Sequence, residues 1–530
     1  MRRFITTIIL SLLAVNLFGN DGLPNPRLFL KKVFFPVIET PAVFSSTVDD
    51  KEFLVFIEHS DSLHINGHYM ALEEDMTDTL PFKLEAKGRK AILYYEGEKE
   101  VFRPRIKSID AQHAIGNARL SLFKTAHFQF NLHETPVFHD FENNRYQDTL
   151  FAVEELYDIP YAKVSGFWSK LGDETAVSDK IFQMGSAISE TQLDLHLDVF
   201  RPQGDTLQKR PLVMLVHGGA FYFGSKDDKS ITQWCRHLAS MGYVAATIDY
   251  RIGFLPTMAS IGRAGYRAVQ DAHAAMRFLV SHQEEYGIDT TMIFVGGASA
   301  GAITALNLAF MTNETRPEYT HGTLLRPDLG NIDTCGNAIR NNFRIKGIID
   351  MWGAMPDTSL MHDRNIPILA FHGDADDIVP YGYDYPFGIA GLLKTMLVDK
   401  MYGSSCIVDR AIKLGHKAHL VTFGGYKHSP HVNPITKALN DNFFVIQEMM
   451  SDFFYDIVTP QKTEIVEEND HYYLKPYPLQ ASWKVDGGVI LDSKGNSIEV
   501  AWISNAPQHS ITVSTILPYG LGLNTTQTFN

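Results

Sequence analysis

The feature that most constrains the fold is Gly297-Ala298-Ser299-Ala300-Gly301, which joins a short apolar run at 292–295 to a helix-like run at 303–310. Small residues on both sides of a serine suit a sharp, strained turn from a strand into a helix, because no bulky side chain fits there. In such a turn the serine oxygen stands clear of the backbone. We therefore expect an exposed Ser299 hydroxyl, which becomes reactive only with a base, an orienting acid and amide donors elsewhere in the chain.

Length and composition limit the classes of protein to which this chain can belong. The chain has 530 residues, which is long for one core and predicts two or three domains. Hydrophobic residues make up 45% and charged residues 20%, a balance typical of globular proteins. The formal net charge of −14 argues against a nucleic-acid partner. The three cysteines, Cys235, Cys335 and Cys406, form at most one disulfide, so stability must come from packing.

The N-terminus predicts a signal peptide over residues 1–20. Arg2 and Arg3 precede an apolar run that continues to about residue 18, which is short for a membrane span. The alternative is an uncleaved anchor helix. We expect an exported protein, periplasmic, at the cell surface or extracellular, with no membrane span once the signal is removed.

Three regions follow the signal. Residues 24–148 form a β-rich domain of unknown role, and residues 465–530 return to short strands. Between them, residues 149–458 alternate strands with helices. This alternation predicts an α/β domain with a mostly parallel sheet and helices on both faces. A polar insertion at 312–342 interrupts the rhythm, and we expect it to be a lid or a substrate-facing segment.

Candidate amide donors follow the apolar strand at 212–216, in His217-Gly218-Gly219-Ala220. Glycines let the backbone turn so that N–H groups point into a site, where they can receive the negative oxygen of a tetrahedral intermediate. The N–H just after the serine can contribute as well. An ordinary Gly-Gly turn is the alternative. The candidate oxyanion donors are Gly218, Gly219, Ala220 and Ala300.

Candidate acids follow the strand at 368–371, in the segment His372-Gly373-Asp374-Ala375-Asp376-Asp377. Carboxylates here lie at the C-terminal end of a strand, where α/β sites assemble. We favour Asp376, and interpret Asp374 and Asp377 as turn-capping or solvated charges. His372 is interpreted as a structural histidine.

The candidate base follows the strand at 419–423, in a glycine-containing loop that carries His428 and His431. His428 is favoured and His431 is the alternative. The order Ser299, Asp376, His428 is that of α/β-hydrolases, distinct from chymotrypsin and subtilisin.

A zinc site is the competing interpretation of these histidines, because His416 and His419, like His428 and His431, form H-x-x-H pairs. The pairs lack the helical spacing that puts two imidazoles on one face, and His419 begins a strand. We therefore expect no metal and no cofactor.

Residues 149–458 resemble the α/β-hydrolase superfamily, in particular carboxylesterases and hormone-sensitive-lipase-like esterases. Besides the serine turn, the likeness is carried by the motifs His-Gly-Gly-Ala at 217–220, Asp-Tyr-Arg at 249–251, Asp-Ala-His-Ala-Ala at 271–275 and His-Gly-x-x-Asp-x-x-Val-Pro at 372–380. The resemblance implies that Gly219 and Ala220 supply oxyanion donors, and that Asp249 and Asp271 are structural. Ala220 departs from the commoner third glycine.

The tail from about residue 470 resembles PKD-like, immunoglobulin-type modules of secreted bacterial proteins. This likeness rests on Trp483-x-Val485-x-Gly487-Gly488-x-Ile490 and on Ile498-x-Val500-x-Trp502.

Together these features predict a secreted serine hydrolase that cleaves a small-molecule or polysaccharide-linked carboxylic ester through an acyl-enzyme. Two alternatives remain open at this point: a prolyl-oligopeptidase-type serine peptidase, and a non-catalytic hydrolase-like surface binding protein.

Overall fold

The chain divides into two compact units, one of residues 143–461 with 517–521, and one of residues 1–142, 462–516 and 522–530. The signal predicted over residues 1–20 lies outside the described part of the chain. The computed structural model describes residues 42–48, 51–61, 63–72, 78–87, 90–95, 98–109, 113–121, 124–133, 136–141, 143–166, 191–254, 260–324, 326–362, 364–388, 399–459, 463–469, 471–476 and 478–529.

An eight-stranded sheet in the order β19-β16-β14-β13-β11-β12-β10-β9 forms the centre of the first unit. The strands from β19 to β12 in this order run parallel, and β10 and β9 pair antiparallel at one edge. The strands are β9 (Val153–Gly166), β10 (Thr191–Pro202), β11 (Arg210–Val216), β12 (Val244–Ile248), β13 (Ile288–Ala298), β14 (Ile345–Met351), β16 (Ile368–Gly373) and β19 (Ala418–Phe423).

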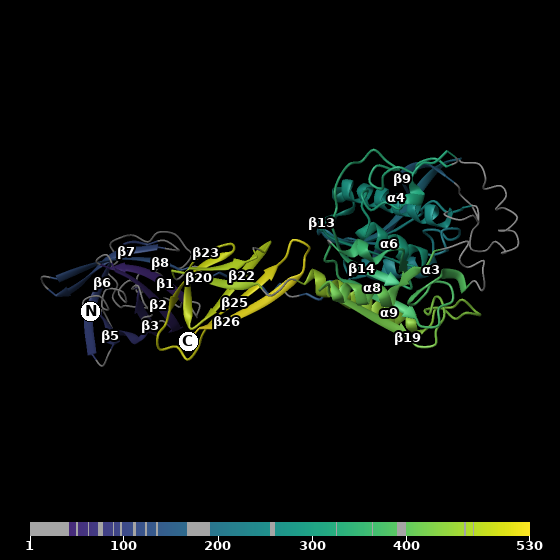
Figure 1. Cartoon of the computed structure of the whole chain (residues 1–530). Helices are drawn as coiled ribbons and strands as arrows, with labels where there is room; N and C mark the ends of the chain where they lie inside the picture. Colours follow the sequence, from purple (N-terminus) through teal and green to yellow (C-terminus); the bar gives the residue numbers. More distant parts are fainter. Residues whose placement is uncertain are drawn as a thin grey trace. The chain divides into compact units, whose positions relative to one another are not determined.

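Helices cover both faces of this sheet (Figure 1). Ile293 and Val295 belong to the core that also holds residues of α4 (Ser260–Ser281) and α6 (Ala300–Phe310). Phe294, between them, packs its ring against Phe454 of α9 (Asp441–Val458), with centroids 4.7 Å apart. Because neighbouring residues of a strand point to opposite faces, α9 lies on the face away from α4 and α6. The predicted fold class is confirmed.

The α-helices of this unit are α3 (Lys229–Ser240), α4 (Ser260–Ser281), α5 (Gln283–Tyr286), α6 (Ala300–Phe310), α8 (Ser404–Lys413) and α9 (Asp441–Val458). Short 3-10 turns are η2 (Glu318–Thr320), η3 (Thr358–Met361) and η4 (Pro386–Gly388), and a small sheet joins β15 (Ala354–Met355), β18 (Met401–Gly403) and β17 (Tyr383–Asp384). None of the described helices is both long enough and apolar enough to cross a bilayer.

The second unit is built from strands alone in its described part. Its N-terminal portion is a closed antiparallel barrel of β1 (Ala42–Val48), β2 (Lys51–Ser60), β3 (His64–Ala71), β4 (Leu80–Lys87), β5 (Lys90–Tyr95), β6 (Glu98–Ile109), β7 (His113–Ser121) and β8 (Lys124–Leu132). The barrel closes where β1 pairs with β8, through partners such as Phe44 and Leu132.

The C-terminal portion of that unit is a pair of sheets with a shared core around Trp483 and Trp502. One sheet holds β20 (Glu464–Glu468), β21 (His471–Lys475), β24 (Ser497–Trp502) and β23 (Gly488–Lys494), and the other holds β22 (Gln480–Asp486), β25 (His509–Ile516) and β26 (Gly522–Phe529). Its likeness to PKD modules stays a prediction.

Candidate active site

The turn at Ser299 has the strained geometry that its sequence predicts. Ser299 has φ 56° and ψ −119° and stands directly before α6. A β-carbon at Gly301 would lie 2.0 Å from the carbonyl oxygen of Val216, so only glycine lets the start of α6 approach β11 this closely. The Ser299 N–H donates to the Met351 carbonyl at 2.8 Å, which ties the turn to the end of β14.

Three side chains from three separate strand ends meet at this turn. Nε2 of His428, in the loop after β19, lies 2.9 Å from Oγ of Ser299. Nδ1 of His428 lies 2.7 Å from Oδ2 of Asp376, in the loop after β16. An ionised carboxylate only accepts, so Nδ1 carries the proton and Nε2 presents its lone pair to the serine hydroxyl. This arrangement of hydroxyl, imidazole and carboxylate suits proton abstraction from the serine.

The carboxylate of Asp376 is buried and its hydrogen-bonding capacity is filled. Oδ1 accepts the N–H groups of Ile378 at 2.8 Å and Val379 at 3.0 Å. Oδ2 faces both His428 and Nε2 of His372, the latter at 3.2 Å. Burial raises the pKa of Asp376, but the hydrogen bonds from the two histidines outweigh it and hold that pKa well below its ordinary value. Asp376 is therefore an anion throughout the neutral range.

The alternatives considered for the acid have other partners. Oδ1 of Asp374 accepts the N–H of Gly425 at 2.6 Å. Oδ2 of Asp377 lies 2.8 Å from Nζ of Lys427 in an exposed ion pair. The structure therefore brings Asp376, and neither neighbour, to the imidazole of His428.

The alternative base, His431, lies in the same pocket but faces a different hydroxyl. Its Nε2 is 2.9 Å from Oγ of Ser230, and its ring stacks on Trp352 with centroids 4.7 Å apart. Burial, with the nearby His428, lowers the pKa of His431 to about 4. His431 is thus neutral at pH 7 and forms part of the wall of the pocket.

The loop at 217–221 turns through left-handed backbone conformations. Gly219, Ala220 and Phe221 have φ values of 113°, 53° and 60°. No described residue accepts a hydrogen bond from the backbone N–H groups of Gly219, Ala220 or Ala300. These three predicted donors therefore remain available to an oxygen bound beside Ser299. The fourth, Gly218, stays a prediction, and its carbonyl takes part in another contact.

That contact comes from Tyr250, a residue to which the sequence analysis gave no separate role. Its hydroxyl donates to the carbonyl of His217 at 3.1 Å and more weakly to that of Gly218 at 3.3 Å. The ring of Tyr250 also stacks on the imidazole of His217, with centroids 4.3 Å apart. Tyr250 thereby fixes the start of the loop that carries the amide donors. Its signal in the sequence was its place in the Asp-Tyr-Arg motif directly after β12.

A pocket of about 310 Å³ opens at Ser299. Its wall combines apolar rings and small backbone segments with a few polar side chains. The lining residues are Gly218, Gly219, Ala220, Phe223, Gly224, Asp228, Ser230, Ala298, Ser299, Trp352, Ile378, His428, Ser429 and His431. The pocket therefore contains the serine, the imidazole and the amide donors together.

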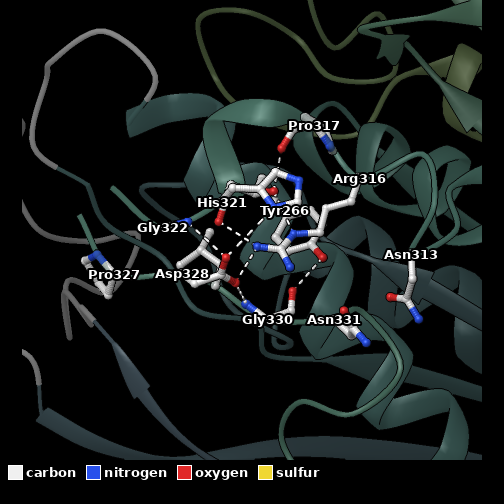
Figure 2. A network of polar contacts seen from close by, with 12 residues as sticks. Tyr266, Asn313, Arg316, Pro317, His321, Gly322, Pro327, Asp328, Gly330 and Asn331 are labelled. Carbon is white, nitrogen blue, oxygen red and sulfur yellow. Dashed lines mark hydrogen bonds and ion pairs between the residues drawn. The ribbon is translucent and has the colours of Figure 1, made fainter. Parts of the chain in front are cut away.

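The insertion at 312–342 packs against α4 through a polar network (Figure 2). Asp328 accepts from Nη2 of Arg316 at 2.5 Å and from the N–H groups of Gly322 and Gly330 at 2.9 and 2.7 Å. The hydroxyl of Tyr266, on α4, donates to the Gly330 carbonyl at 2.8 Å. None of the described residues of the insertion lines the pocket, so a role as a lid stays a prediction.

The other aspartates of the resemblance hold loops in place. Asp271 accepts the backbone N–H of Arg251 at 2.7 Å and pairs with its guanidinium at 2.8 Å. Asp249 accepts the N–H of Lys226 at 2.9 Å. As for metals, the described residues include no group of three or more His, Cys, Asp or Glu side chains placed to hold an ion.

Comparison with known proteins finds a matching family and several similar esterases. Residues 197–365 match the BD-FAE family. Gut esterase 1 of Caenorhabditis elegans is 31% identical over 134 residues, which are 25% of this chain and 23% of that protein. The probable carboxylic ester hydrolase LipM of Mycobacterium tuberculosis is 26% identical over 178 residues, 33% of this chain and 36% of that protein. The chain thus spans well under half the length of either relative.

Among solved structures, the apo form of Thermogutta terrifontis esterase 2 is 18% identical, with a TM-score of 0.36, over 57% of this chain and 98% of that chain. The family match includes Ser299 and the loop at 217–221 but ends before Asp376 and His428. The family match therefore covers the serine, while the placement of the acid and the base rests on the geometry above.

Proposed function

We propose that this chain is a carboxylic ester hydrolase of the α/β-hydrolase type that works through an acyl-enzyme on Ser299. The observation that carries the proposal is the hydrogen-bonded series Ser299–His428–Asp376 beside amide groups with no partner in the described structure. Similarity to named esterases, and the BD-FAE family match over residues 197–365, which include Ser299, support it.

The proposed reaction follows from the position of each group. Nε2 of His428 takes the proton of the Ser299 hydroxyl while its oxygen attacks the ester carbonyl carbon. Asp376 holds the imidazole in the required tautomer and stabilises the cation that forms. His428 then gives the proton to the departing alcohol, and water, activated by the same imidazole, releases the acid from Ser299.

The negative charge of the tetrahedral intermediate is proposed to fall on an oxygen held by the N–H groups of Gly219, Ala220 and Ala300. Ala300 is the first residue of α6, whose N-terminus carries a partial positive charge that favours an anion. One such donor contributes about 10²–10³ in rate. The pocket at Ser299 would admit a small-molecule ester or one linked to a polysaccharide.

We also propose that the protein is exported, on the strength of the charged start and apolar run within residues 1–20. Cell fractionation and N-terminal sequencing of the mature protein test this. A protein found in the cytoplasm with Met1 retained would contradict it.

Labelling with a fluorophosphonate, followed by peptide mapping, tests the proposed nucleophile. We expect the label on Ser299, and we expect Ser299→Ala to abolish both labelling and ester hydrolysis while the circular dichroism spectrum is unchanged. Since the acyl bond forms on this hydroxyl in the proposed reaction, the rate should fall by roughly 10⁶. A folded Ser299→Ala protein with wild-type turnover would show the assignment to be wrong.

A panel of model esters and of proline-containing peptides then separates the alternatives. Ester cleavage without peptide cleavage supports the esterase, and the reverse identifies a prolyl-oligopeptidase-type peptidase. A wild-type protein that neither takes the label nor cleaves either substrate would be a non-catalytic binding protein.

A further inference from the structure

A second histidine stands behind the triad acid. His372 is fully buried, and its Nε2 lies 3.2 Å from Oδ2 of Asp376, the same oxygen that faces His428. Nε2 of His372 also lies 3.2 Å from the carbonyl oxygen of Val379. Both neighbours are acceptors, so Nε2 of His372 must carry a proton and donate it. Asp376 thus receives hydrogen bonds from two imidazoles.

The other nitrogen of His372 leads deeper into the protein. Nδ1 lies 2.7 Å from Oγ of Ser404, the first residue of α8, and Ser404 is itself fully buried. Beside Ser404 lies Asp350 at the end of β14, whose side chain has no exposure to solvent. Oδ1 of Asp350 accepts the Gly353 N–H at 2.8 Å, whereas Oδ2 has no hydrogen-bond partner among the described residues.

The buried carboxyl is held in a way that favours its neutral form. Burial raises the pKa of Asp350, and His372, Ser404 and the Gly353 N–H lower it only in part. Nδ1 of His372 faces the Ser404 hydroxyl, which can donate to it or accept from it. Nε2 of His372 faces Asp376 in either case.

We propose that His372 is a positioning residue of the triad, which fixes Asp376 and limits the negative charge that this carboxylate presents to His428. The proposal rests on the esterase function proposed above and deepens it. A hydrogen bond to a carboxylate withdraws part of its charge, so the neighbouring imidazolium is stabilised less than it would be by an otherwise unshared carboxylate. The donor from His372 therefore keeps His428 available as a base at lower pH.

Several titratable groups of the described residues surround His372 and Asp376. Asp350 comes from β14, Asp376 from the loop after β16, and His428 from the loop after β19. Tyr381 packs edge-on against His372 with ring centroids 5.6 Å apart. His431 lies beside His428 and is neutral at pH 7, because burial lowers its pKa to about 4. Among these groups, Asp376 and His428 are the ones that take part in the proposed reaction.

Two amide substitutions separate the proposed role from simple packing. The amide nitrogen of Gln can reach the position of imidazole Nε2, whereas that of Asn reaches only the position of Nδ1. His372→Asn thus removes the donor to Asp376, and His372→Gln restores it. The measurement is the pH at which kcat/KM falls to half of its plateau on the acidic side, with a model ester as substrate.

We expect His372→Asn to raise this half-activity pH by on the order of half a unit or more, because Asp376 then presents more charge to His428. His372→Gln should lie close to the wild-type value. If the two variants lose thermal stability but both keep the wild-type half-activity pH, His372 is a packing residue and the proposal is overturned.

Ser404→Ala provides the test if His372→Asn does not fold. Without the Ser404 hydroxyl, the His372 ring loses the contact at Nδ1 that orients it, so its Nε2 donor is held less firmly against Asp376. We expect a smaller rise of the half-activity pH in the same direction, and an unchanged value would overturn the proposal.

A measurement without turnover separates failure of this proposal from failure of the esterase function. In protein with ¹⁵N-labelled histidine, we expect His372 to show a protonated Nε2 across the neutral range, with assignment by comparison with His372→Gln. An unprotonated Nε2 would contradict the proposal even in an active esterase. A protonated Nε2 in a protein without esterase activity would contradict only the proposed function.

Discussion

Two carboxylates of the first unit are held in similar ways and do different things. Asp376, at the end of β16, and Asp328, in the insertion on α4, each accept two backbone N–H groups and at least one side-chain donor. The pKa of each lies well below its ordinary value. They differ in exposure, since the side chain of Asp376 is 0% exposed and that of Asp328 is 49% exposed. They also differ in the partner that they bind.

The partner decides the chemistry. Arg316 holds its protons at any accessible pH, so its bond to Asp328 can only fix the shape of the insertion (Figure 2). The imidazole of His428 can gain and lose a proton, so its bond to Asp376 can serve a reaction. Several hydrogen bonds to a carboxylate therefore do not by themselves identify a catalytic acid. A catalytic acid is identified by a titratable partner that also contacts a nucleophile.

The largest expected effect on the rate comes from replacing the carboxylate of Asp376. In Asp376→Asn the amide can donate to Nδ1 of His428, which places the imidazole proton on Nε2 and removes the lone pair from Ser299. We expect kcat to fall by roughly 10³–10⁴ with little change in KM. Steady-state kinetics with a model ester measure this.

Asp374→Asn and Asp377→Asn are the matched controls, because they make the same chemical change within three residues of Asp376. Their partners are the Gly425 N–H and Lys427, neither of which touches Ser299. Their rates should lie far above that of Asp376→Asn. Equal losses in all three variants would mean that the loop, and not the carboxylate of Asp376, matters.

The next effect concerns the amide donors. A β-carbon at Gly219, where φ is 113°, would lie 2.2 Å from the Phe223 carbonyl oxygen. Gly219→Ala must therefore displace the loop, and we expect kcat/KM to fall by roughly 10²–10³, the effect of losing one oxyanion donor.

Ala220→Gly is the counterpart, since Ala220 already has a left-handed φ of 53°. This change keeps the N–H and removes a strained β-carbon, so the free energy of unfolding should rise by up to about 1 kcal/mol. Thermal denaturation measures it. A loss of rate in Ala220→Gly as large as in Gly219→Ala would contradict the proposed geometry of the donors.

The comparison also separates what local sequence could predict from what it could not. Ser299 was predictable because its constraint is local: small neighbours permit a turn that the structure shows with φ 56°. Choosing His428 over His431 depended on which imidazole reaches Ser299, a contact across 129 positions of sequence. The sequence favoured His428 and left His431 as the alternative, and the coordinates show His431 facing Ser230.

Other features could not be predicted from local sequence patterns. The sequence predicted only a structural role for His372. Its neighbours Ser404 and Asp350 come from α8 and β14, and no motif joins the three. Alternating strands predicted a β-rich N-terminal region, but the pairing of Phe44 with Leu132 that closes its barrel has no local signature. The network around Asp328 lies in a polar loop without periodicity, where charged residues are usually solvated.

The smallest effect on the rate is expected from replacing the carboxylate of Asp328. The hydrogen bond from Arg316, followed by those from the Gly330 and Gly322 N–H groups, lowers the pKa of Asp328 below its unfolded value of 3.8. A carboxyl with a lowered folded-state pKa stabilises the fold above its unfolded pKa, and this contribution is lost as the pH falls through the folded value. The network should therefore be intact at pH 7 and weaken only in strong acid.

Asp328→Asn removes this ionic contribution at every pH. We expect faster hydrogen exchange at the Gly322 and Gly330 amides at pH 7, because both lose a charged acceptor, while kcat/KM stays within about twofold of wild type, as for surface substitutions away from a site. Hydrogen-exchange mass spectrometry across residues 312–331 measures the first effect. If kcat/KM instead fell as far as in Asp376→Asn, the insertion would take part in the reaction. The contrast between Asp328, which holds a loop in shape, and Asp376, which orients the base, would then be wrong.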